Sequence, residues 1–92
     1  MAVRIHTNLA GVTEEEFAAV HKHVTAGPPP QGLIFHSSGP IDGGWGVLDF
    51  WESRADYDAA MPQVQAAIAA AGVSMQGPPE IEEFVVYEIV KP

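Results

Sequence analysis

Alternating apolar and polar positions along the chain predict four β-strands. Residues 2–7 place Val3 and Ile5 on one side and Arg4 and His6 on the other, which is the two-residue period of a strand. Residues 32–38, 45–52 and 81–90 are rich in β-branched and aromatic side chains and predict three more strands. Residues 39–44 are rich in glycine and predict that the second and third strands form a hairpin with a loop of about six residues.

The segment after the first strand has the signals of a helix. Thr13 and Glu16 form a capping-box pattern at its start, and Gly27 with the prolines at 28–30 marks its end. The apolar stripe of this helix is expected to comprise Phe17, Val20 and Val24. His21 follows Phe17 by one turn and therefore lies on the flank of the stripe.

A second helix is predicted directly after the third strand. Ser53 followed by Asp56 is an N-cap pattern, and Gly72 is typical of a helix end. Apolar residues recur at helical spacing between these ends, at Tyr57, Met61, Val64, Ile68 and Ala71. Pro62 removes one backbone hydrogen bond, so we expect a kink or a break in the helix at that point.

The resulting order, β-α-β-β-α-β, is that of the ferredoxin-like fold, an α+β architecture with a four-stranded antiparallel sheet. Two helices cover only one face of such a sheet. The third strand nevertheless carries large apolar residues on both faces, with Trp45 and Trp51 on one and Leu48 and Phe50 on the other. We therefore predict a homodimer in which two copies pack their uncovered sheet faces together.

Composition restricts the possible functions. The 92 residues are few enough for one domain, spanning 1–92. Twelve acidic residues against four Lys or Arg give a net charge of −8, which argues against nucleic acid and against anionic membranes as partners. The chain has no cysteine, and no histidine pair has metal-ligand spacing, so neither a disulfide nor a metal site is predicted. The N-terminus lacks signal-peptide features, and we expect a cytoplasmic protein.

The strand-to-helix junction at 47–53, the segment around His36 and Gly39, and the proline in the second helix together resemble the dimeric α+β barrel superfamily. This group includes antibiotic-biosynthesis-type monooxygenases, polyketide cyclases, isomerases and haem-degrading enzymes. The resemblance implies that Trp51 and the polar first-strand residue His6 face the helices. The haem-degrading branch uses an axial histidine on the second helix. Residues 53–72 contain no histidine, so haem is not expected and no cofactor is predicted.

The candidate site lies on the odd-numbered face of the third strand. If Ser38 pairs with Trp45, His36 lies opposite Val47 and shares a face with Asp49. His36 is then the candidate base and Asp49 its orienting partner. The residues expected to line the substrate pocket are His6, Trp45, Trp51 and Tyr57. Each also has a structural interpretation, since buried aromatic residues usually pack the core and a strand histidine usually bonds to backbone or water.

Two classes of function follow from this site. The first is a cofactor-independent monooxygenase acting on an aromatic or polyketide-type small molecule, or a cyclase or isomerase of the same fold. The second is a non-catalytic dimer that binds a ligand or serves as an accessory protein. The sequence pattern does not choose between them.

Overall fold

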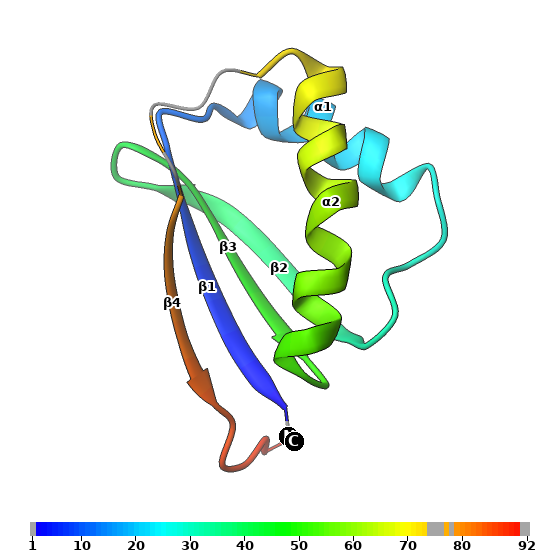
Figure 1. Cartoon of the computed structure of the whole chain (residues 1–92). Coiled ribbons are helices and arrows are strands. Elements are labelled where there is room, and N and C mark those ends of the chain that lie inside the picture. The colour runs from blue at the N-terminus through cyan, green and yellow to red at the C-terminus, as the bar shows by residue number, and fades with distance from the viewer. Residues whose placement is uncertain (1, 74–76, 78, 91–92) are drawn as a thin grey trace.

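The computed structural model describes residues 2–73, 77 and 79–90 and has the predicted β-α-β-β-α-β order (Figure 1). Its strands and helices, in chain order, are β1 (Val3–Ala10), α1 (Glu14–Thr25), β2 (Leu33–Ile41), β3 (Gly44–Trp51), α2 (Arg54–Ala71) and β4 (Glu80–Val85). The four strands form one antiparallel sheet in the order β2-β3-β1-β4. Both helices lie on the same side of the sheet, which confirms the α+β ferredoxin-like fold.

The sheet has a helix-covered face and an open face. Strand register places on the helix-covered face Val3, Ile5, His36, Ser38, Trp45, Val47, Asp49, Trp51 and Glu83. The open face carries Arg4, His6, Phe35, Ser37, Gly46, Leu48, Phe50, Glu82 and Phe84. The buried core lies on the covered face and consists of Val3, Ile5, Trp51, Tyr57 and Ala60, with Leu33 and Met61 packed against it. Within the described residues no helix is long and apolar enough to cross a membrane.

The hairpin between β2 and β3 differs from the prediction. Its turn is only Asp42-Gly43, because β2 continues to Ile41 and β3 begins at Gly44. Gly43 has a φ of 77°, a conformation that glycine adopts without strain. Asp-Gly between two alternating segments is itself a hairpin signal, so the expected six-residue loop was wrong for a reason visible in the sequence. The preceding glycine and proline, Gly39 and Pro40, are part of the outer strand.

The expected interruption at Pro62 is also wrong, since α2 is continuous from Arg54 to Ala71 with the proline inside it. A proline removes a single intrahelical hydrogen bond. Buried residues on both sides of Pro62, namely Tyr57, Ala60 and Ala67, keep the two halves of the helix packed.

The last strand, β4, ends at Val85, five residues earlier than predicted. Beyond the end of β4, the Val86 N–H donates one further hydrogen bond, to the Ala2 carbonyl at 2.8 Å.

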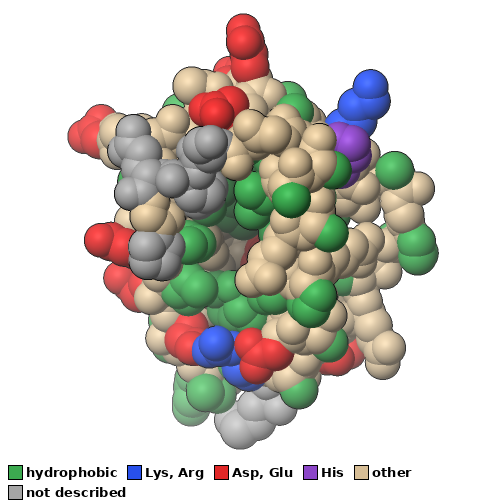
Figure 2. Space-filling model, turned by 45° about the horizontal axis from the view of Figure 1, so that its top comes forward, with side chains coloured by type: hydrophobic (Ala, Val, Ile, Leu, Met, Phe, Trp, Pro, Cys, Tyr) green, Lys and Arg blue, Asp and Glu red, His purple; other side chains and the backbone are tan. Residues whose placement is uncertain are grey.

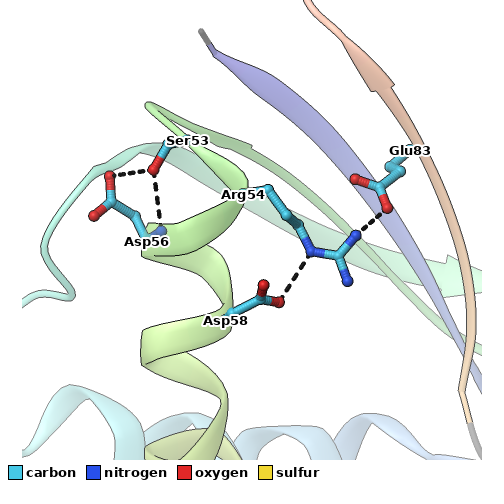
Figure 3. Close-up of polar contacts among 5 residues, drawn as sticks. All are labelled: Ser53, Arg54, Asp56, Asp58 and Glu83. Carbon is cyan, nitrogen blue, oxygen red and sulfur yellow. Dashed lines mark hydrogen bonds and ion pairs between the residues drawn. The ribbon is translucent and has the colours of Figure 1, made fainter.

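The predicted starts of both helices and the predicted end of α2 at Gly72 are confirmed, whereas α1 ends at Thr25 with Ala26 as its C-cap, just before Gly27. Thr13 and Glu16 form both bonds of the capping box on α1. At the start of α2 the Ser53 hydroxyl accepts the Asp56 N–H at 3.1 Å and donates to the Asp56 carboxylate at 3.0 Å (Figure 3). Arg54 then bonds to Asp58 within α2 and to Glu83 on β4, which ties the helix to the edge of the sheet (Figure 3).

Gly32 positions the start of β2 against this helix end. It has a φ of 83°, and a Cβ atom there would lie 2.2 Å from the Asp56 carboxylate. Its carbonyl also accepts the Glu52 N–H at 2.7 Å. The segment that leads into His36 can therefore lie close to the strand-to-helix junction only because residue 32 has no side chain.

We expect Gly32→Ala to lower the free energy of unfolding by about 1–3 kcal/mol, because it combines a strained φ with a clash. Urea unfolding followed by circular dichroism measures the change. Gly39→Ala is the matched control, since a Cβ atom at Gly39 meets nothing within 4 Å. Equal stability of the two variants would contradict this account.

Candidate functional site

The candidate site is centred on a hydrogen bond between β2 and β3. His36 and Asp49 are direct cross-strand partners, and His36 Nδ1 lies 2.6 Å from Asp49 Oδ1. An ionised carboxylate only accepts hydrogen bonds, so Nδ1 carries the proton and donates it. In the neutral ring this leaves Nε2 as a hydrogen-bond acceptor, and no described residue bonds to it. The arrangement is that of a base whose tautomer is fixed by a carboxylate.

The predicted register was wrong by two residues. Ser38 pairs with Val47 and His36 with Asp49, because the short Asp42-Gly43 turn brings β2 further along β3. Side chains alternate with a period of two, so a shift of two residues leaves every side chain on its predicted face. His36 therefore lies on the helix-covered face, as the prediction required, and directly opposite Asp49 rather than diagonal to it.

Asp49 raises the pKa of His36 above its usual value of 6.5, chiefly through the hydrogen bond and also through its negative charge. Partial burial acts in the opposite direction and is outweighed. The Asp49 side chain is 14% exposed and that of His36 is 31% exposed. The imidazole is thus held by a largely buried carboxylate while part of its own ring reaches the surface.

Aromatic rings from α1 and β3 surround the imidazole. Phe17 is nearly parallel to His36, with 6.4 Å between ring centroids and 5° between planes. Phe17 also stacks on Trp45 at 5.4 Å, and His21 stacks on His36 at 5.8 Å. The predicted residue Trp45 is therefore joined to His36 through Phe17. Helical spacing predicts Phe17 in the apolar stripe of this helix and His21 one turn later on its flank, but it does not predict that the two rings reach His36.

Trp51 and Tyr57 lie on the same face of the sheet but within the core. Their side chains are 3% and 6% exposed, and their rings meet edge to face at 5.8 Å. Burial raises the pKa of the Tyr57 hydroxyl and outweighs the positive charge of Arg54, which lowers it. Trp51 and Tyr57 therefore belong to the core cluster rather than to the ring cluster around His36. Trp51 packs in this core with Val3 and Ile5 of β1.

Both indole N–H groups are buried without an acceptor. Within the described residues, Trp45 Nε1 and Trp51 Nε1 have no hydrogen-bond partner. A buried donor of this kind loses its hydration and gains nothing in return, so it requires an explanation. Trp51 Nε1 belongs to the core, whereas Trp45 is partly exposed and its indole N–H belongs to the ring cluster around His36. Figure 2 shows that the surface is hollowed near the centre of the view and that hydrophobic side chains border this hollow.

His6 does not join this site, and its expected place beside Trp51 is wrong. It pairs with Leu48 across the β1–β3 ladder, which puts it on the open face. There it lines a shallow depression together with Ser37, Gly46 and Leu48. The alternation within β1 explains the outcome, because the core residues Val3 and Ile5 occupy the opposite side of the strand.

The described residues include no group of three or more His, Asp or Glu side chains placed to hold a metal ion. Among the described residues, the site thus consists of the hydrogen-bonded His36–Asp49 pair, the neighbouring rings of Phe17, His21 and Trp45, and the indole N–H of Trp45, which has no acceptor. A histidine held in this way can accept a proton from a ligand that reaches its Nε2 atom.

Comparisons with known proteins identify the fold. Neither a protein-family model nor a curated protein matches the sequence. Among solved structures, a candidate antibiotic biosynthesis monooxygenase from Caulobacter crescentus has a TM-score of 0.70 at 21% identity, covering 95% of this chain and 91% of its own. SnoaB, a cofactor-independent oxygenase from Streptomyces nogalater, has a TM-score of 0.62 at 12% identity, with coverage of 99% and 97%. A dimeric ferredoxin-like protein of unknown function from Thermobifida fusca gives 0.65 at 18%, with coverage of 94% and 92%. The chain shares the fold of antibiotic biosynthesis monooxygenase-like proteins.

We expect Asp49→Asn to lower the pKa of His36, because the amide supplies neither the charge nor an equivalent acceptor. A raised pKa means that the pair stabilises the fold fully below pH 6.5 and that this contribution is lost as pH rises through the raised value. The variant should therefore lose more stability in mildly acidic than in alkaline buffer. NMR titration of the His36 ring and urea unfolding at both pH values measure these effects. An unchanged titration of His36 would contradict the assigned hydrogen bond.

Proposed function

We propose that this protein is a small cofactor-independent oxygenase that acts on an aromatic or polyketide-type substrate. The observation that supports it most directly is the 2.6 Å bond from His36 to Asp49 on the helix-covered face. This bond leaves Nε2 free to take a proton beside Phe17 and Trp45. The fold shared with a cofactor-independent oxygenase adds support at the level of architecture only.

The reaction needs a substrate whose anion is electron-rich enough to reduce oxygen. His36 would remove a proton from an activated carbon or hydroxyl group, and the resulting anion would react with O₂. A CH₂ group beside an aromatic ring becomes a carbonyl in this way: one oxygen atom enters the product and the other leaves in water. The electrons come from the substrate itself, so no separate reductant is required.

The indole N–H of Trp45, which has no acceptor within the described residues, fits this chemistry. Negative charge develops on oxygen when such a substrate loses a proton, and donors already aimed into a water-poor site stabilise that charge. Trp45 Nε1 lies on the face that carries His36 and is joined to it through the ring of Phe17. The imidazolium formed at His36 remains paired with Asp49, so the transferred proton does not leave an isolated buried charge.

We also propose that the active form is a homodimer joined through the open face. Large apolar side chains occupy that face, with Phe35 44% and Phe84 53% exposed, and Phe35 stacks on Phe50 at 4.5 Å. An aromatic surface of this kind on a sheet is typical of an interface. The shared fold with a dimeric ferredoxin-like protein is consistent with a second copy as the occupant.

The catalytic proposal is tested with a thermal-shift panel of phenols, hydroquinones and anthrones, followed by oxygen-consumption measurements on each ligand that stabilises the protein. His36→Ala should lower turnover by about 10²-fold or more, the usual loss for a general base. His23→Ala, on the exposed surface of α1, is the control and should keep full activity. Ligand binding without oxygen uptake would favour the non-catalytic dimer, and conversion without oxygen uptake would favour a cyclase or isomerase.

For the dimer, Phe50→Glu should give a monomer in light scattering, because the interface would bury an unpaired charge at a cost of several kcal/mol. Ala66→Glu introduces the same charge on the exposed side of α2 and should leave the oligomeric state unchanged. A wild-type protein that is monomeric at micromolar concentration would refute the dimer without affecting the site.

A further inference from the structure

A further positioning residue emerges from the way α1 lies on the sheet. The helix packs mainly against α2, and none of its residues is buried. Its ring contacts with the sheet run through Phe17 and His21, which lie one turn apart and stack on each other at 5.9 Å. These two rings stack on His36 and Trp45. The helix therefore places an aromatic cover over the His36–Asp49 pair.

We propose that His21 is a positioning residue for His36, holding the imidazole in the plane that presents Nε2 to a ligand. This inference rests on the proposed role of His36 as a base. The bond from Nδ1 to Asp49 fixes one atom of the ring, but a ring held at a single atom can still tilt about that bond. His21 lies at 5.8 Å with 22° between planes and restricts this tilt.

The stacking contact, rather than the chemistry of a second imidazole, is the property that this role needs. Phe17 lies in a near-parallel position beside His21, so the His36 ring is already supported by one benzene ring. A flat neutral ring also interacts favourably with a charged imidazolium, which suits the state that His36 reaches after accepting a proton. A phenylalanine at position 21 should therefore support the His36 ring as well as the histidine does.

The cover is also placed where it can limit access by water. His36 keeps 31% of its side chain exposed with His21 present, and removal of the His21 ring would enlarge that fraction. Exposure weakens the bond to Asp49, because water competes for both partners. The His21 ring thus acts on His36 in two ways that share one cause, the presence of a flat group over the imidazole.

Three variants of the full chain test the proposal: His21→Ala, His21→Phe and His23→Ala. NMR with ¹⁵N detection reports the tautomer of His36 and the solvent exchange of its Nδ1 proton. His21→Ala should speed that exchange by about threefold to tenfold, the factor expected for one lost aromatic pair. His21→Phe should retain the wild-type rate. His23 is exposed, as His21 is, but it makes none of the ring contacts recorded for the described residues, so His23→Ala should change nothing.

With a substrate from the oxygen-uptake assay, His21→Ala should lower kcat by about tenfold with little change in KM, because the base is displaced while the binding site persists. Phenylalanine should restore kcat. Unchanged proton exchange in His21→Ala, or a His21→Phe variant that behaves like alanine, would overturn the proposal. Since the NMR measurement needs no substrate, it remains decisive even if the oxygenase proposal fails. Thermal unfolding of each variant identifies any loss that comes from the fold.

Discussion

The pairing of β2 with β3 is the constraint on which the candidate site depends. The Asp42-Gly43 turn fixes the register, and the register places His36 opposite Asp49. Directly opposed side chains on a sheet are close enough to bond without help from loops. The pair therefore lies between the edge strand β2 and the central strand β3, which is also bonded to β1 on its other side. A site built on strands in this way keeps its geometry when no ligand is bound.

The sequence predicted the element order, both helix starts and the face that carries His36, because each depends on local signals or on alternation. It did not predict the exact pairing, because the glycine and proline at 39 and 40 suggested a loop where the chain continues as an edge strand. The prediction still placed His36 on the same face as Asp49, because a register error of two residues leaves each side chain on its face. For His6 the predicted face was wrong. The family resemblance implied that His6 faces the helices, but alternation along β1, with Val3 and Ile5 buried, places it on the open face.

The ring cluster was beyond prediction for a different reason. Helical spacing puts Phe17 and His21 on one face of α1, but it does not say which strand they meet. The strands that these two rings meet depend on how α1 packs against α2, and local helical spacing does not determine that packing. An apolar stripe on a helix next to a sheet ordinarily ends in the core. Here the core is formed by α2 with β1 and β3, and α1 is left to cover β2 and the outer part of β3.

Side-chain alternation along β3 places the His36–Asp49 pair and the exposed apolar side chains on opposite faces of the sheet. Asp49 lies on the covered face, where its carboxylate is 14% exposed and bonded to His36. Its neighbours in sequence, Leu48 and Phe50, lie on the open face, where aromatic side chains remain exposed. Covering the open face would remove water from the far side of the same strand and make its ladder harder to open. Dimerisation of this kind would stabilise the His36–Asp49 geometry without contributing a single atom to the site.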